Sequence, residues 1–107
     1  MKIINMTPHS IVVSQGDNVE TFEPCGTVIR METIEKPLTP VNGFEVVSTS
    51  IVNHNLPDQV SGVMLLVSAM VLASFPDRKD LIAPNTGRAV RNEKGHIVSV
   101  PGFISNP

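Results

Sequence analysis

The chain has 107 residues, of which 41% are hydrophobic and 17% are charged, and this composition excludes a disordered tail. A formal net charge of −2 excludes a general duplex-DNA binder, which needs a basic surplus to neutralise phosphates. One cysteine, Cys25, excludes an intrachain disulfide and a cysteine-rich metal site. We therefore expect a single domain over residues 1–107.

The composition favours strands along most of the chain. Val, Ile and Thr are abundant, and β-branched residues fit well on a pleated sheet. Nine prolines and seven glycines divide the chain into short segments. We therefore expect a mainly β domain, a compact barrel or sandwich of about eight short strands. In chain order the strands are expected at 2–6, 10–14, 19–22, 27–35, 44–52, 63–67, 89–92 and 96–100.

Short connections complete the first half of this pattern. Pro8 interrupts the first strand because proline cannot donate to a ladder. A turn at 15–18 joins two strands into a hairpin, and 37–43 is a loop or an edge because it holds two prolines and a glycine. The segment 63–67 is apolar on both faces, which is typical of a central strand.

The second half holds the one helix that we expect, near 68–75. Alanine, methionine and leucine favour a helix there, and Pro76 ends it. A long polar loop is expected over 77–87, and the last hairpin follows it. We expect the C-terminus to dock only as far as Phe103 or Ile104. The apolar run that includes the helix is shorter than the roughly 20 residues of a membrane span, and no signal peptide is evident, so we expect a cytoplasmic protein without a membrane partner.

Basic residues are concentrated in the second half of the chain. Residues 1–58 carry a net charge of −4 and residues 59–107 a net charge of +2. Arginine forks suit phosphate oxygens, and loop amides and hydroxyls such as those of Asn85 and Thr86 add neutral donors. The alternative is a solvated loop whose charges pair with nearby carboxylates. The basic residues concerned are Arg78, Lys79, Arg88, Arg91 and Lys94.

The segment Thr7-Pro8-His9 is a second candidate site. A proline inside a strand forces a bulge or an edge, and such irregularities aim side chains into sites. His9 is suited to hydrogen-bond a base or a phosphate, and Thr7 offers a hydroxyl. The alternative is a capped strand break with a partly buried histidine.

Motifs for catalysis or metal binding are missing. No pair of histidines has the spacing of metal ligands, and there is no nucleophile elbow or glycine-rich phosphate loop. We expect no catalytic residue, no metal and no cofactor. Trp and Tyr are also absent, which argues against binding a long single strand by stacking. A small nucleotide, stacked on an arginine, a histidine or a proline, fits this composition better.

The segment Asn5-Met6-Thr7-Pro8-His9 resembles the "NLTPH" opening of a family of small proteins that is common in bacteriophage genomes. Met6 in place of Leu and Lys79 in place of Asp are the departures from the family pattern. The similarity covers most of the chain and continues at 26–30, 46–49, 66–68, 78–87, 89–97 and 101–103.

The resemblance implies a function in immune evasion. Small phage proteins of this style include anti-CBASS sponges, which hold a cyclic dinucleotide in a homo-oligomer and hide it from the host effector. By this resemblance the chain sequesters a nucleotide second messenger in the host cytoplasm without cleaving it, and binds no long nucleic acid. A site between symmetric copies offers each arginine twice, once for each phosphate. The expected phosphate ligands are Arg30, Arg78, Arg88 and Arg91, and the expected base or ribose contacts are Thr7, His9, Ser68, Asp80, Asn85 and Thr86.

Two other functions stay open at this point. One is a protein-interaction module, such as a phage structural accessory or an inhibitor of a host protein. The other is a small nucleotide hydrolase in which His9 serves as acid or base.

Overall fold

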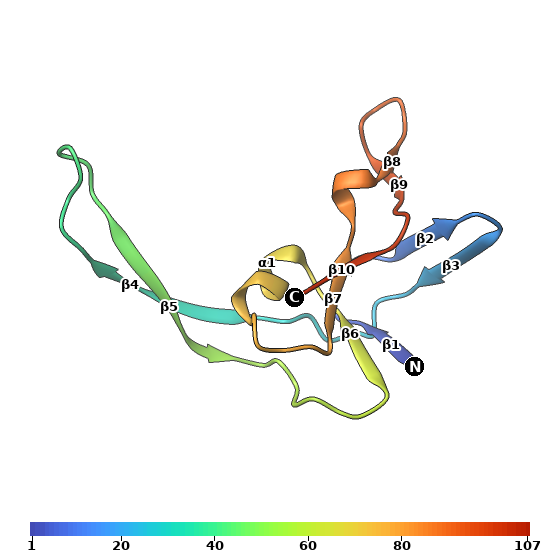
Figure 1. The fold of residues 1–107 in the computed structure, drawn as a ribbon, viewed down its shortest axis with the longest axis horizontal. Coiled ribbons are helices and arrows are strands. Elements are labelled where there is room, and N and C mark those ends of the chain that lie inside the picture. The colour runs from blue at the N-terminus through green and yellow to red at the C-terminus, as the bar shows by residue number, and fades with distance from the viewer.

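The computed structural model describes residues 1–107 and is built around a sheet of four strands in the order β1-β6-β7-β10 (Figure 1). β1 (Lys2–Asn5), β6 (Val63–Leu66) and β7 (Leu81–Pro84) run parallel, and β10 (Phe103–Ser105) is antiparallel to β7. The helix α1 (Ala69–Ser74) connects β6 to β7, so these three elements form a β-α-β unit. All three parallel strands therefore end at the same edge of the sheet.

Three antiparallel hairpins extend from this sheet (Figure 1). β2 (Ile11–Gln15) pairs with β3 (Asn18–Phe22), and β4 (Met31–Pro37) pairs with β5 (Val47–His54). β8 (Val90–Arg91) pairs with β9 (Ile97–Ser99), directly after the 3-10 turn η1 (Thr86–Arg88). The molecule is elongated, with extents of 53 × 38 × 26 Å.

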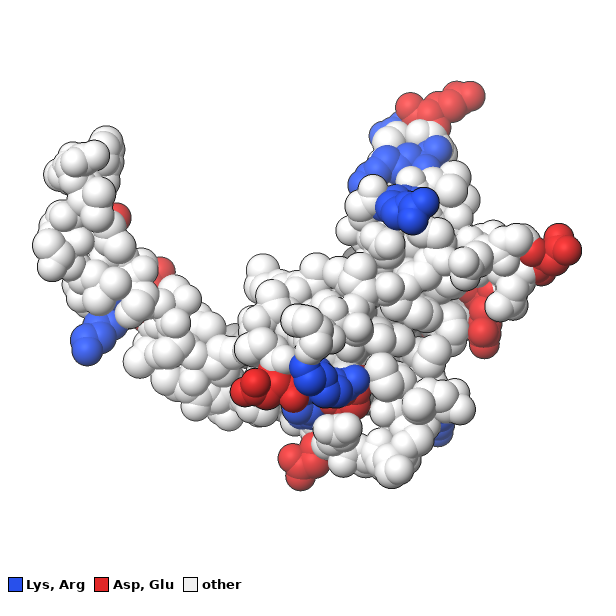
Figure 2. Space-filling model, in the orientation of Figure 1, with Lys and Arg blue, Asp and Glu red and all other residues white.

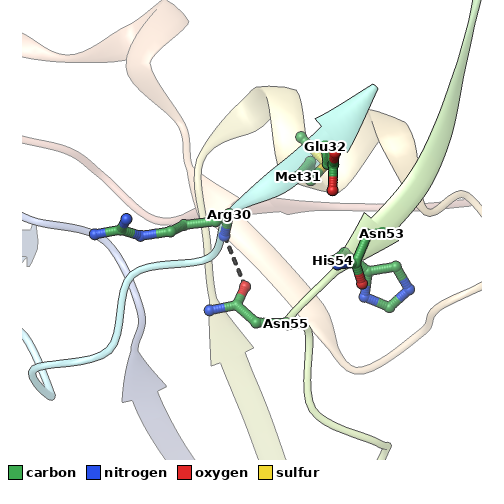
Figure 3. A pocket seen from close by; sticks show the side chains of 6 residues that line it. All are labelled: Arg30, Met31, Glu32, Asn53, His54 and Asn55. Carbon is green, nitrogen blue, oxygen red and sulfur yellow. Dashed lines mark hydrogen bonds between the residues drawn. The ribbon is translucent and has the colours of Figure 1, made fainter. Parts of the chain in front are cut away.

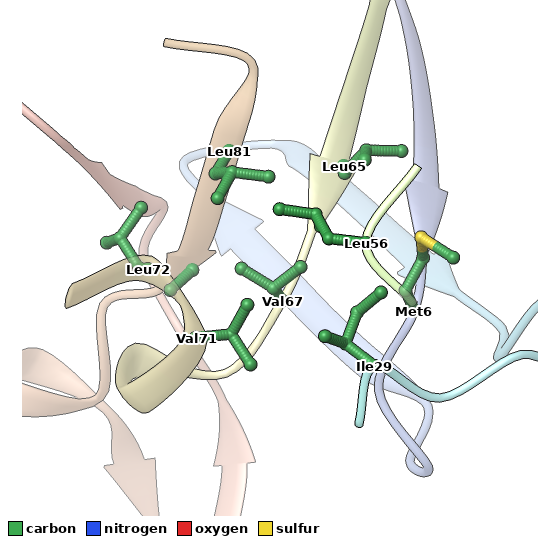
Figure 4. Packing of buried hydrophobic residues seen from close by; sticks show 9 residues of the cluster. Met6, Ile29, Leu56, Leu65, Val67, Val71, Leu72 and Leu81 are labelled. Atoms are coloured by element: carbon green, nitrogen blue, oxygen red, sulfur yellow. The ribbon is translucent and has the colours of Figure 1, made fainter. Parts of the chain in front are cut away.

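The core lies where β6 and β7 meet α1 and the first loop (Figure 4). β6 is apolar on both faces because it is the inner strand between β1 and β7. Leu66, Val67 and Leu81 are fully buried. The core cluster consists of Met6, Ile29, Leu56, Leu65, Val67, Val71, Leu72, Leu81 and Ala83.

The mainly β fold with a single short helix is confirmed. The helix occupies Ala69–Ser74 within the expected 68–75, and Ser68 caps it by accepting a hydrogen bond from the Val71 N–H at 3.2 Å. With six residues, this helix is far too short to cross a bilayer, and there is no longer one. The predicted hairpin around 15–18 and the central strand at 63–67 are also present.

Several details differ from the sequence-based expectation. No closed barrel forms, and the sheet is mixed, with ten strands in the molecule. The predicted loop at 77–87 contains the inner strand β7, whose apolar run of three residues was too short to predict a strand. β4 begins only at Met31, because Asn55 binds the backbone of the preceding residues and holds them outside the ladder.

The C-terminus also docks further along the chain than we expected. The Asn106 side-chain amide lies 3.2, 2.9 and 3.2 Å from the carbonyl oxygens of Leu72, Phe75 and Arg78. Asn106 therefore donates to carbonyls at the end of α1 and in the turn that follows, and adds to the backbone hydrogen bonds that the Leu72 and Phe75 carbonyls already accept.

Candidate functional site

A cleft of about 1090 Å³ lies where the parallel strands end. Parallel strands bring the residues that follow their carboxyl ends together, and this edge is the usual place for ligands in open parallel sheets. The lining residues on this side are Thr7, Pro8 and His9 after β1, Ser68 and Ala69 after β6, and Pro84 and Thr86 at the end of β7.

Two hairpins form the walls of the cleft. One wall begins at Ile11 and Val12 of β2, and the other is the segment 97–100 around β9. The Val100 N–H donates to the Val12 carbonyl at 2.9 Å, and the Ser14 N–H donates to the Val100 carbonyl at 2.9 Å. These backbone hydrogen bonds fix the separation of the two walls.

A buried asparagine, Asn5, shapes the loop that carries His9. Its side-chain Nδ2 donates to the carbonyls of His9 and Phe22, each at 2.8 Å. Its Oδ1 accepts from the Thr7 N–H at 2.9 Å and the Thr7 hydroxyl at 2.7 Å. All four hydrogen-bonding places of the amide are thus used, and the chain around Pro8 has one defined path.

Thr7 was predicted from the sequence to contact a ligand, but in the structure its side chain has another role. It is buried, and its hydroxyl donates to Asn5 instead of facing a ligand freely. His9 is exposed at the rim of the cleft, with its backbone held by Asn5. Thr7 therefore positions His9, and His9 is the residue of this segment that can reach a ligand.

The remaining cleft residues that the sequence predicted are polar and exposed. They are Ser68, Thr86 and Arg91. The Arg91 Nη1 donates to the Gly95 carbonyl at 2.9 Å, which orients the guanidinium across its own hairpin turn. The one ion pair of the molecule lies elsewhere, so no carboxylate neutralises Arg91. Its other donors are free for an anionic group.

Arg78 and Asp80 do not reach the cleft. Asp80 is buried, and Arg78 binds it with both prongs of its fork, Nε to Oδ1 at 2.8 Å and Nη2 to Oδ2 at 2.7 Å. Nη2 also donates to the Pro57 carbonyl at 2.8 Å. Hydrogen bonding to Asp80, helped by Coulombic attraction, raises the pKa of Arg78 against the effect of burial. This pair stabilises the turn before β7. For Arg78, the structure therefore agrees with the alternative interpretation of the sequence, in which basic residues of this loop pair with nearby carboxylates.

Arg30 lines a separate, shallower pocket of about 290 Å³ at the base of the β4–β5 hairpin (Figure 3). Its backbone N–H donates to the Asn55 side-chain oxygen at 2.7 Å, while its guanidinium points away from Asn53 and His54. The structure therefore does not bring Arg30 together with the other predicted phosphate ligands.

Asn85 and Arg88 lie in the same loop as Thr86 but beside the cleft. Asn85 is half-buried, and its N–H donates to the Gly102 carbonyl at 3.0 Å. Arg88 is exposed at the end of η1 and has no ion-pair partner. The side chains of the β8–β9 region form a largely basic surface at the upper right of Figure 2, with one acidic group at its tip.

Sequence reasoning missed two residues of the site. His96 is exposed on the cleft, and its backbone N–H donates to the Asn92 Oδ1 at 3.0 Å, which sets the hairpin turn. The predicted hairpin already placed His96 on the strand facing Arg91. Asn5 was missed although an Asn two residues before a Thr is a pattern for a local side-chain turn.

No cluster of three or more His, Cys, Asp or Glu side chains is arranged to hold a metal ion. The chain matches no family model, no curated protein and no solved structure.

Proposed function

We propose that this chain is a phage-type immune-evasion protein that binds a nucleotide second messenger, a cyclic dinucleotide, and sequesters it without cleaving it. The observation that carries the proposal is convergence. Four residues chosen from the sequence as ligand contacts line one cleft with exposed side chains, although they come from four separate segments: His9, Ser68, Thr86 and Arg91.

The size and the chemistry of the cleft support a ligand of this class. A volume of about 1090 Å³ slightly exceeds the usual range for small-molecule sites, roughly 300–1,000 Å³, and leaves room for a dinucleotide. Arg91 offers an unpaired cationic fork for a phosphate. Ser68 and Thr86 offer hydroxyls for ribose or base edges, although Ser68 also caps α1.

The cleft also offers surfaces for bases without aromatic side chains. The imidazoles of His9 and His96 line it, and Ile97 and Val98 add exposed aliphatic surface on β9. A base can lie against such a surface and stack on an imidazole, which replaces the absent Trp and Tyr. One chain supplies one Arg91, whereas a cyclic dinucleotide has two phosphates. We therefore include a homo-oligomer in the proposal, with two copies contributing to one ligand.

Retention of an intact ligand is the test. The purified protein is mixed with cyclic di-AMP, cyclic di-GMP, cyclic GMP–AMP and cyclic trinucleotides, free ligand is removed by filtration, and heat then releases what is bound. We expect at least one ligand to leave the filtrate and to return unchanged on heating. Effective sequestration requires a Kd near the nanomolar range, about −12 kcal/mol.

Two variants locate the site. Arg91→Ala should weaken binding at least about tenfold, since a charge-assisted hydrogen bond is worth roughly 1.5–3 kcal/mol. Lys2→Ala removes the same charge at the amino end of β1, away from the cleft, and should bind as the unmodified protein does. Equal binding by the unmodified protein, Arg91→Ala and Lys2→Ala would show that the ligand does not bind in the cleft through Arg91. A ligand returned as a new species would indicate an enzyme, with His9 the first residue to replace. A panel left wholly in the filtrate would favour a protein-interaction module.

A further inference from the structure

The β4–β5 hairpin, residues 31–54, is an arm whose outer part extends away from the body of the molecule (Figure 1). Only its base contacts the body, where Met31 packs against the core and the His54 ring lies 4.9 Å from the Phe75 ring. β4 and β5 pair only with each other, and both outer edges of this ribbon are unpaired. Its tip is a tight turn in which Asn42 and Gly43 both have positive φ, 50° and 79°, as in the favoured two-residue hairpin turn. The arm is thus well formed locally, but a two-stranded ribbon alone is only marginally stable in water.

The arm exposes large apolar side chains. At the tip, Phe44 is 74% exposed and Val41 is 58% exposed. Along the ribbon, Ile34 and Leu38 lie on one face by alternation, and Val52 is the unpaired residue at the register shift between Glu32 and Thr33. All three are about half exposed, at 53%, 48% and 52%. Much of the arm is also free of charge in the view of Figure 2.

The whole chain has more surface and a larger radius than a monomer of its size. Its accessible surface is 7547 Å², whereas a folded monomer of 11.6 kDa has about 5,800 Å². Its radius of gyration is 16.6 Å, against about 13 Å for a compact chain of this length. The excess of about 1,700 Å² per chain amounts to about 3,400 Å² for two chains, which is within the range of obligate homodimers, roughly 2,000–5,000 Å².

The β8–β9 region, residues 86–99, has a surface that complements the arm. The arm carries three acidic residues and one basic residue, Glu32, Glu35, Glu45 and Lys36, whereas residues 86–99 carry three basic residues and one acidic residue, Arg88, Arg91, Lys94 and Glu93. Val90, Ile97 and Val98 add exposed apolar surface beside these basic groups. By alternation Glu32 lies on the same face of the arm as Ile34, and Glu35 lies on the opposite face, so acidic groups are present on both faces of the ribbon. The opposite net charges of the arm and of residues 86–99 favour attraction between the two surfaces.

We infer that the arm of one copy docks on the β8–β9 region of a second copy of this chain, and that the reciprocal contact closes a two-fold dimer. Such a contact is self-complementary, because each chain supplies one acidic arm and one basic hairpin. It covers the apolar side chains that the isolated chain exposes. The arm of each copy also borders the cleft of the other, because Arg91, Ile97 and Val98 belong to both surfaces. The inference does not rest on nucleotide binding, and its test contains no nucleotide.

A charge exchange tests this contact. One chain carries Glu32→Lys and Glu35→Lys in the arm, and the other carries Arg88→Glu and Lys94→Glu in the hairpin. All four side chains are exposed, so each chain should keep its fold and its circular dichroism spectrum. In sedimentation velocity over about 1–100 μM, the unmodified chain should have at least twice the mass of 11.6 kDa. Each reversed chain alone should self-associate at least about tenfold more weakly, because like charges then face each other.

An equimolar mixture of the two reversed chains should associate again, since each arm then meets a hairpin of opposite charge. The matched control, Asp17→Lys with Glu20→Lys, makes the same charge change on the β2–β3 hairpin and should associate as the unmodified chain does. The inference is overturned if the unmodified chain is monomeric throughout, if the arm-reversed chain associates as tightly as the control, or if mixing restores nothing.

A second measurement uses the unmodified sequence. Isotopically heavy and light chains are mixed and cross-linked with a carbodiimide, which joins carboxylates to amines directly. We expect heavy–light peptide pairs that join Glu32, Glu35 or Glu45 of the arm to Lys94. A dimer whose heavy–light pairs never include the arm would overturn the inference.

Discussion

Asn5 is 3% exposed, and its amide makes four hydrogen bonds to backbone groups and to Thr7. Through them, one side chain holds the start of β2, the end of β3 and the turn that presents His9. The sequence motif that begins at Asn5 is therefore explained mostly by folding: Asn5 and Thr7 bind each other, and Met6 enters the core. Pro8 and His9 are the exposed residues of the motif, and only these can serve recognition.

Replacing Asn5 with Ala should lower the free energy of unfolding by about 2 kcal/mol, because buried backbone groups lose their partners. Urea denaturation followed by circular dichroism measures this. Asn92→Ala is the matched control, since Asn92 binds the Lys94 and His96 N–H groups in the same way but is exposed; its cost should stay below about 1 kcal/mol. Equal losses of unfolding free energy for Asn5→Ala and Asn92→Ala would contradict the structural role that we infer for Asn5.

Replacing Arg78 with Met should also lower the free energy of unfolding, by about 2 kcal/mol. The change leaves the buried carboxylate of Asp80 without its partner. The loss of unfolding free energy is moderate because the Arg78 side chain is 21% exposed and solvent screens the pair. Arg88→Met removes an arginine without an ion pair and should cost less than about 0.5 kcal/mol. A ligand titration of Arg78→Met should still show binding. Loss of binding with unchanged stability would indicate that Arg78 contacts the ligand after all.

At the scale of elements, the sequence predicted local features better than long-range ones. The hairpin around 15–18, the helix and the central strand follow from turn residues and local apolar patterns, and all were predicted. The strand β7 was not, because its short apolar run looks like a loop that touches the core. Parallel pairing was not predicted either, since it joins β1 to β6 across about sixty residues and leaves no local signal.

The same contrast between local and long-range features explains which residues of the candidate site could be predicted. Thr7, His9, Ser68, Thr86 and Arg91 were chosen as polar residues in loops or at strand ends, and the parallel sheet brings those ends together. Arg30, Arg78, Asp80, Asn85 and Arg88 were chosen for the same reason, yet they lie elsewhere or beside the cleft. Residue type and loop position could thus be predicted, whereas convergence required the topology.

Shortening a side chain of β7 tests whether this strand is an inner strand of the core. Leu81→Ala should cost about 3 kcal/mol of unfolding free energy, because Leu81 is fully buried and its loss leaves a cavity. Ile104→Ala on the neighbouring strand β10 should cost less than about 1 kcal/mol, since Ile104 is 39% exposed. Thermal unfolding in the same buffer compares them. A smaller effect at Leu81 than at Ile104 would mean that β7 is not the inner strand of the core.

At the scale of the whole molecule, a small core is combined with surfaces that lack partners. The core gathers around β6, β7 and α1, while the arm and the β8–β9 region extend away from it (Figure 1). The cleft lies between this core and the β8–β9 region. A ligand would therefore contact the carboxyl ends of the parallel strands, next to the buried core, and at the same time a hairpin that lies outside this core. Binding should then order the hairpin more than the sheet.

We propose above that the carboxyl ends of β1, β6 and β7 form a nucleotide site. The most direct measurement is a titration of uniformly ¹⁵N-labelled protein with cyclic di-AMP, cyclic di-GMP or cyclic GMP–AMP, with every backbone amide followed by NMR. We expect a binding nucleotide to shift the amides of His9, Ser68, Thr86, Arg91 and His96 and to leave those of Lys2 and Arg30 nearly unchanged. Shifts that gather at Arg30 and His54 instead, or spectra that stay identical for all three nucleotides at millimolar concentration, would contradict it.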